Sequence, residues 1–483
     1  MSDIPREAWN ENANFSRHHP RLAVLFFSLV EMGSYFSRPE TMPAEEPETA
    51  RTGEKRKSTA NNASSSASKR NKTTKQRRDH FRKNQSWESR GDNRPERDGP
   101  KEARIPKKKV ALLIGFNGTG YQGMQLNPNA KSIEDDVFKA LCKAGAISKD
   151  NSDDPKKVQW MRAARTDKGV HAAGNVLSLK MSMPGDDIIR DINSHLPDQI
   201  RVWGYVPTKR SFHAKTQCDS RVYEYLLPTY AFMPPSPREL CDTPQSENDL
   251  KIFQNDVEKY IARSTPEELR AKDGYRISEQ QLAQFREALS KFVGTHNFHN
   301  YTIGRGAKDR SCNRYIMDLK VEDPIYINGA EWLSVKLHGQ SFMLHQIRKM
   351  ISMALLIVRS ESAMSLIDKS FEETRINIPK APAVGLLLER PVYSAYNKHT
   401  ERDPIDFDAY KDTIEEFKQT WIYKKIFEEE RENGIFDVFL ASVDSNPGPE
   451  FSYLNAEGVI PEDAIVHTKH NTPKKEEVVE DED

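Results

Sequence analysis

The alternation of apolar and polar positions predicts regular structure from Lys107 onward. The run Val110–Phe116 is continuously apolar and predicts a buried strand. Asn175–Met181 alternates between apolar and polar residues and predicts a strand with one buried face. By the same criteria, further strands are expected at residues 158–164, 221–227, 313–321 and 331–339.

Helical spacing of apolar residues appears in four segments. Ser132 is a good N-cap for a helix with a buried face, and Ser278 with Gln281 forms a capping box before a second helix. Residues 342–358 predict a long apolar helix. In 407–421, aromatic and aliphatic residues recur every three or four positions, which predicts an amphipathic helix. Packing of that helix on the preceding domain is favoured over binding of a partner.

The order of these elements predicts an α+β fold with two similar halves. The expected domains are a disordered basic arm (1–106), two halves of a catalytic domain (107–218 and 219–400), a helical extension packed on the core (401–460) and a disordered acidic tail (461–483). Residues 231–245 are rich in proline and predict a loop insertion.

Charge is distributed unevenly along the 483 residues, although the formal net charge is zero. Residues 54–109 hold 19 Lys and Arg against 7 Asp and Glu, whereas residues 401–483 hold 9 against 23. Two basic blocks, Lys55–Lys57 and Lys69–Arg78, fit a bipartite nuclear import signal or an arm that contacts RNA, and also a solubilising linker. Nuclear import is favoured.

The cysteines and the apolar segments indicate the cellular environment in which the protein folds. The four cysteines are scattered, which predicts a reduced intracellular protein with no disulfide framework. The apolar stretch 22–36 is too short to span a bilayer, so no membrane association is expected. Met42 is an alternative start. A chain that begins at Met1 allows a minor mitochondrial pool, although early acidic residues argue against it.

Two segments carry candidate chemistry. Gly118–Gly123 matches the glycine spacing of a dinucleotide-binding turn, but the next helix begins only at Ser132, so a strained loop is the favoured interpretation. Asp167 lies on a tight loop, flanked by Arg165, Lys168 and His171. Basic neighbours keep a carboxylate ionised, which suits a nucleophile or a base. A structural turn with a surface ion pair explains the same pattern.

The string Arg165–Ala172 (R-T-D-K-G-V-H-A) resembles the signature loop of the TruA-type tRNA pseudouridine synthases. Other segments match the family's opening motif and its later motifs in the same order, and their H-Q-I-R-K-M and E-R-P-V-Y forms resemble its eukaryotic branch. They are residues 116–125, 218–226, 292–302, 339–350 and 381–397. The resemblance covers about residues 107–400 and implies the pseudouridine synthase fold, with two ferredoxin-like halves sharing a mainly antiparallel sheet and flanking helices.

The resemblance also implies roles for individual residues. Asp167 would be the catalytic nucleophile or base, Tyr223 would stack on the uracil, and Arg348 would pair with Asp167. Arg165 would support the flipped base. Tyr223 as a plain sheet residue and Arg348 as a phosphate clamp are the alternatives. The expected RNA-binding residues are Lys168, His171 and Lys349, whereas His296 and His299 are expected to be structural.

The implied activity is isomerisation of uridine to pseudouridine in tRNA, at several positions in and around the anticodon stem. U2 small nuclear RNA and messenger RNA are further expected substrates. The expected protein is a nuclear monomer that needs no cofactor for the chemistry. Zinc is associated with some fungal members of the branch, but the sequence locates no site for it. The alternatives are an anticodon-loop-specific paralogue and a catalytically silent RNA-binding relative.

Overall fold

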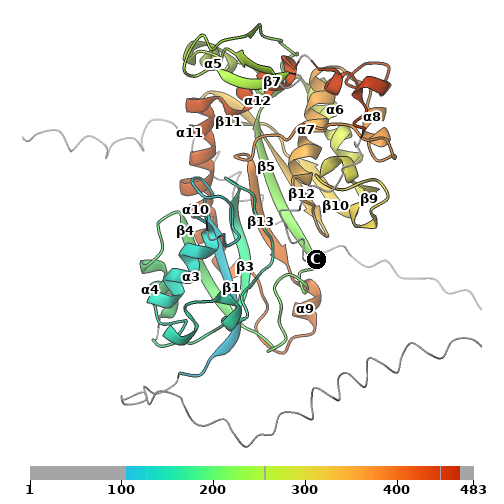
Figure 1. Cartoon of the computed structure of the whole chain (residues 1–483). Coiled ribbons are helices and arrows are strands. Elements are labelled where there is room, and N and C mark those ends of the chain that lie inside the picture. The colour runs from blue at the N-terminus through green and yellow to red at the C-terminus, as the bar shows by residue number, and fades with distance from the viewer. Residues whose placement is uncertain (1–104, 128, 186, 255–256, 447, 468–483) are drawn as a thin grey trace, which may run out of the picture. The chain divides into compact units, whose positions relative to one another are not determined.

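The computed structural model describes residues 105–127, 129–185, 187–254, 257–446 and 448–467 (Figure 1). Contacts divide the chain into two units, Met1–Asp98 and Gly99–Asp483, and the described residues all belong to the second unit. The basic arm, its two basic blocks, the apolar stretch near the N-terminus and the end of the acidic tail lie outside the described residues.

A ten-stranded sheet forms the centre of the second unit, with the order β4-β1-β3-β13-β5-β12-β10-β9 and with β2 and β11 paired at its side. β13 runs parallel to β3, and the other pairs of this sheet are antiparallel. This confirms the expected α+β class and mainly antiparallel sheet. The strands are β1 (Lys108–Phe116), β2 (Met161–Arg162), β3 (His171–Met181), β4 (Ile200–Pro207), β5 (Ser220–Pro228), β9 (Gly294–Asn297), β10 (Asn313–Val321), β11 (Ile325–Ile327), β12 (Ala330–Gly339) and β13 (Leu386–Val392).

The two halves of the sheet are joined through β13, which enters from the later part of the chain. Leu388 of β13 pairs with Ala172 of β3 on one side and with Tyr223 of β5 on the other. Figure 1 shows β13 and β5 running side by side through the middle of the unit. One strand therefore separates the strand that follows the Asp167 loop from the strand that carries Tyr223.

Helices flank the sheet, and local capping sets where several of them begin. The N-cap side chain of Ser132 accepts from the Asp135 amide, and three acidic residues occupy the first turn, where the helix dipole favours them. The predicted capping box of Ser278 and Gln281 is also confirmed. The α-helices are α3 (Ile133–Lys143), α4 (Ile188–Ser194), α5 (Pro266–Lys272), α6 (Glu279–Ser290), α7 (Gln346–Arg359), α8 (Ser365–Lys369), α9 (Ser394–Lys398), α10 (Lys411–Phe417), α11 (Lys424–Asn433) and α12 (Ile435–Asp444).

Two predicted elements differ from the observed ones because of left-handed residues. The strand expected at 158–164 is a 3-10 turn (Pro155–Val158) followed by the two-residue β2, since Gln159 has φ 56°. The helix expected at 342–358 begins only at Gln346, because His345 has φ 64° and ψ 0°. A residue in this conformation cannot continue a right-handed helix or an extended strand.

The C-terminal extension packs on the sheet, as its amphipathic pattern predicts. The expected helix is α10, followed by a π-helical segment, η7 (Lys418–Tyr423), and by α11. Phe417 contacts Trp203 edge to face at 5.2 Å. A Cβ at Gly204 would lie 2.0 Å from the Tyr410 hydroxyl, so only glycine permits this contact.

Order at the end of the extension continues past the predicted boundary. A 3-10 turn occupies Glu462–Ala464, and Ile465 forms a β-bridge with Ile376. Residues 461–467 therefore belong to the folded unit, contrary to the disorder expected from Pro461 onward. Pairing with another segment supplied the backbone partner that composition could not reveal.

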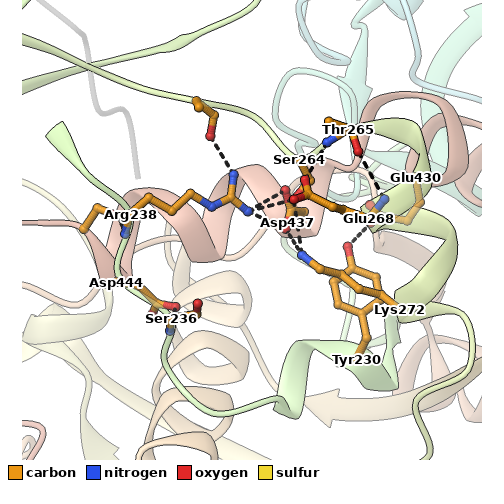
Figure 2. A network of polar contacts seen from close by, with 12 residues as sticks. Tyr230, Ser236, Arg238, Ser264, Thr265, Glu268, Lys272, Glu430, Asp437 and Asp444 are labelled. Carbon is orange, nitrogen blue, oxygen red and sulfur yellow. Dashed lines mark hydrogen bonds and ion pairs between the residues drawn. The ribbon is translucent and has the colours of Figure 1, made fainter. Parts of the chain in front are cut away.

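The Pro-rich insertion predicted at 231–245 contributes one short strand to a small sheet. The strands of that sheet are β6 (Leu240–Cys241), which lies in the insertion, and β7 (Leu250–Gln254) and β8 (Val257–Ile261), which lie after the insertion. Figure 2 shows how α12 is tied to it: Asp437 accepts from Arg238 at 3.0 Å and from Lys272. Tyr230 donates to Glu430 of α11 in the same network.

Within the described ranges, none of the helices combines the length and the apolar character that crossing a membrane requires.

Candidate active site

The loop that carries Asp167 connects β2 to β3 and is held by the glycine-rich segment after β1. The Met124 amide donates to the Thr166 carbonyl at 3.2 Å, and the Gly169 amide donates to the Tyr121 carbonyl at 3.4 Å. A Cβ at Gly118 would lie 2.1 Å from the Val170 carbonyl oxygen. The glycines therefore let two loops approach closely. This supports the strained-loop interpretation over a dinucleotide site.

His171 forms part of this packing and has no exposed surface. Its Nδ1 accepts from the Gly118 amide at 3.1 Å. Burial lowers the pKa of His171 to about 4, so the ring is neutral near pH 7. The structure contradicts the expected RNA contact, because β3 begins at His171 and directs this ring into the core.

The Asp167 carboxylate is one-quarter exposed and is approached by two side chains, those of His345, the N-cap of α7, and of Arg348 in its first turn. His345 Nδ1 lies 2.9 Å from Oδ2, within hydrogen-bonding range. Arg348 Nη1 lies 3.9 Å from the same oxygen. The predicted Arg348–Asp167 ion pair is thus present but long, and Arg348 Nε donates instead to the Ala381 carbonyl at 2.6 Å.

Reasoning from the sequence missed His345. The available signal is its spacing from Arg348: residues three apart on a helix share a face. This signal is weak, because the sequence predicts one continuous helix over residues 342–358. A continuous helix does not predict a left-handed residue at position 345. The left-handed conformation of His345 places its ring against Asp167 from just before α7.

Tyr223 lies on β5, and β13 separates it from β3, the strand that follows the Asp167 loop. Its side chain is only 7% exposed. Its ring contacts Phe342 edge to face, with centroids 5.2 Å apart. Burial raises the pKa of Tyr223 to about 12, and the Asp167 charge adds to the shift. The phenol therefore stays protonated near pH 7. Tyr225, on the same face of β5, is fully buried and donates to the Pro382 carbonyl.

The remaining expected RNA-binding residues differ in exposure. Arg165 and Lys168 are exposed, and neither forms a hydrogen bond or ion pair with any described residue. Lys349 is 7% exposed, and its Nζ donates to the carbonyls of Asn300 and Thr302 at 3.1 and 3.3 Å. Burial lowers the pKa of Lys349 to about 8. The structure contradicts an RNA contact for Lys349, because the protein itself occupies its ammonium group.

A structural zinc site would need several donor side chains that converge on one point. In the part of the chain that the structure describes, no group of three or more His, Cys, Asp or Glu side chains converges on a point where a metal ion could bind. His296 stacks on Phe371 at 4.3 Å, and His299 is buried. Both histidines lie within the fold, in keeping with their structural interpretation.

Comparison with known proteins shows the family to which the chain belongs. A family described as tRNA pseudouridine synthase matches residues 288–394. The tRNA pseudouridine synthase 1 of Yarrowia lipolytica is 44% identical over 457 residues, covering 80% of this chain and 87% of its own length. The chain belongs to the tRNA pseudouridine synthase family. It is an isomerase that converts uridine to pseudouridine in tRNA.

Other relatives extend the similarity across eukaryotes. The tRNA pseudouridine synthase 1 of Saccharomyces cerevisiae is 42% identical, covering 72% of this chain and 73% of its own length. The mouse pseudouridylate synthase 1 homolog is 37% identical, covering 68% of this chain and 72% of its own length. The expected membership of the eukaryotic branch of the pseudouridine synthases is confirmed.

Proposed function

We propose that this tRNA pseudouridine synthase starts its reaction with Asp167 and modifies several uridines in and around the anticodon stem. The observation that carries the proposal is the Asp167 carboxylate, partly exposed, with His345 at 2.9 Å and exposed Lys168 and Arg165 on its loop. A carboxylate with these neighbours is available to a substrate that phosphate contacts hold in place.

The reaction needs no net change of atoms or electrons. The N1–C1′ bond of the uridine breaks, the freed base rotates, and C5 bonds to C1′. The proton lost from C5 is balanced by one gained at N1. Asp167 acts as nucleophile or base at the start, and no cofactor is required. Burial raises the pKa of Tyr223 further above pH 7 and makes the phenolate scarcer, so stacking on the flipped uracil suits this residue better than removal of the C5 proton.

RNA access to the site requires the uridine to leave its stack, which costs a few kcal/mol. Arg165, which is exposed two residues before Asp167 in the chain, would fill or support the space that the base vacates. Lys168 would contact a neighbouring phosphate. Arg348 would complete the site by holding a positive charge near the Asp167 carboxylate.

The proposal extends to other RNAs and to the cellular compartment. U2 small nuclear RNA and messenger RNA are proposed as further substrates of a monomeric enzyme in the nucleus, with a minor mitochondrial pool from a start at Met1. The basic blocks at 55–57 and 69–78 support nuclear import. The name of the mouse relative mentions pseudouridylate without restriction to tRNA.

A release assay tests the activity and its two alternatives. The purified full chain is incubated with tRNA labelled with tritium at C5 of uridine, and the modified positions are then mapped. Release of tritium at several stem and loop positions is the expected result. A folded chain that binds tRNA without releasing tritium would be the silent relative. Modification confined to one anticodon-loop position would identify the paralogue.

A further inference from the structure

The two oxygens of the Asp167 carboxylate have different surroundings. Both neighbouring donors, His345 Nδ1 and Arg348 Nη1, approach Oδ2, at 2.9 and 3.9 Å. Among the described residues, none forms a hydrogen bond with Oδ1. The carboxylate is therefore anchored at one oxygen, and the other is left for a ligand.

His345 is better placed than Arg348 to fix the orientation of this carboxylate. An ionised carboxylate only accepts hydrogen bonds, so Nδ1 of His345 must carry the proton in this contact. Arg348 has already committed its Nε to the Ala381 carbonyl, and its Nη1 lies beyond hydrogen-bonding range of Oδ2. Arg348 supplies charge, whereas His345 supplies the directional bond.

The backbone conformation of His345 is unfavourable, and the contact of its side chain with Asp167 explains why it is adopted. Its φ of 64° lies in the left-handed region, which is unfavourable for an L-residue. Strain of this kind persists where the surrounding structure requires it and is often found at active sites. Here the turn brings the ring back from the start of α7 to the loop between β2 and β3.

We propose that His345 is a positioning residue for the isomerisation: its Nδ1–H holds Oδ2 of Asp167, so that Oδ1 is the oxygen that acts on the uridine. The inference rests on the proposed role of Asp167. It adds a residue to the reaction and assigns different tasks to the two carboxylate oxygens.

Three substitutions at His345 separate the hydrogen bond from the backbone. Asparagine tolerates a positive φ and places an amide N–H close to the position of Nδ1, so His345→Asn keeps the donor. His345→Asp introduces a side chain with the shape of asparagine, but its ionised carboxylate presents only acceptors to Asp167. His345→Gly accepts the left-handed backbone freely and removes the side chain. Glu361→Gly is the matched backbone control: Glu361 is exposed, has φ 52° and follows the other end of α7.

Single-turnover tritium release, tRNA affinity and thermal midpoint are measured for each variant. We expect His345→Asp and His345→Gly to lose on the order of 100-fold in rate at unchanged tRNA affinity, because a small misplacement of a reacting group has this effect. His345→Asn should recover most of the rate, and Glu361→Gly should match the parent in rate.

Three results would overturn the inference. In the first, the glycine and aspartate variants turn over at the parental rate. In the second, the asparagine variant is as slow as the glycine variant. In the third, rate, affinity and thermal midpoint fall together in all three variants, which would show a merely structural residue. A parent protein that releases no tritium would instead refute the proposed function on which the inference rests.

Discussion

The basic side chains near Asp167 differ in solvent exposure, and therefore in whether RNA can contact them. Lys168 and Arg165 are exposed, whereas His171 and Lys349 are inside the protein and bonded to backbone groups. The sequence could not separate these groups. Almost every residue of β3 is buried on both faces, so the alternation predicted for residues 175–181 does not show which side chains are exposed. Lys349 lies on a helix where nearly every position is buried, as central elements of a large fold allow.

Substitution of Lys168 should therefore affect tRNA binding, whereas substitution of Lys349 should affect stability. Lys168→Ala should weaken tRNA binding and reduce the slope of log affinity against log salt by about 1, with an unchanged thermal midpoint. Lys349→Ala should leave that slope unchanged and lower the free energy of unfolding by about 1–3 kcal/mol, because two buried carbonyls lose their donor. Salt titrations of tRNA binding and urea unfolding distinguish the two. A change of slope in the Lys349 variant would contradict this assignment.

At the scale of elements, the C-terminal extension supports the strands that carry the site. Lys418 of η7 is almost fully buried and forms an ion pair with Glu389 of β13. It also lies 3.5 Å from Glu224, the neighbour of Tyr223 on β5. The Tyr423 hydroxyl donates to Glu224 at 2.7 Å. Glu224 and Glu389 also pair with Lys336 of β12, so the extension adds a second cation to a buried group of charges beside β5 and β13.

A second contact of the extension, between Glu430 and Tyr230, should make stability depend on pH. Burial raises the pKa of Glu430 to about 7, from 4.5 for a free side chain. Between these pH values the folded protein binds a proton that the unfolded chain does not, so this group stabilises the fold increasingly as pH falls through the window. Relative to Glu430→Gln, the parent should gain up to about 3 kcal/mol in free energy of unfolding over this range.

Urea unfolding of both proteins across the window measures the difference. Glu428→Gln is the control, because Glu428 lies exposed on the same helix, and the parent should show no such gain against it. A difference between parent and Glu430→Gln that stays constant with pH would show that the buried carboxyl keeps its ordinary titration.

Elements with strong local signals could be predicted, and those shaped by single residues could not. The caps at Ser132 and Ser278 follow from side chains that bond to nearby amides, so the sequence locates both helix starts. The start of α7 depends on a left-handed histidine, for which the residue type gives only a weak preference. The small sheet depends on pairing of β6, which lies in the Pro-rich insertion, with β8, which lies after it, and the prolines of the insertion predict loop.

At the scale of the whole molecule, the motifs predicted the family and which residues form the site. They did not predict most of the contacts between those residues. Resemblance placed Asp167, Tyr223 and Arg348 in one site, and the structure brings their loop, strand and helix together around β13. The hydrogen bond to His345 and the inward turn of His171 depend on tertiary packing, which no motif specifies. The roles of these residues in catalysis stay predictions.

Nuclear import is a prediction for the part of the chain outside the described residues. Residues 43–109 fused to a fluorescent reporter should direct the reporter to the nucleus, because two basic blocks are separated by a segment without acidic residues. Neutral substitution of the block at 55–57, with the block at 69–78 kept, should reduce import. Cytoplasmic retention of the unmodified fusion would leave RNA contact as the better explanation of the charge.

The most direct test of the account replaces Asp167 with asparagine, which removes the charge and keeps the shape. Single-turnover tritium release from C5-labelled tRNA is measured at saturating enzyme, with tRNA affinity and thermal midpoint determined on the same preparation. We expect release to fall to background while affinity and midpoint remain those of the parent, because phosphate contacts elsewhere hold the RNA. An Asp167→Asn protein that is folded, binds tRNA and still makes pseudouridine would contradict the central claim.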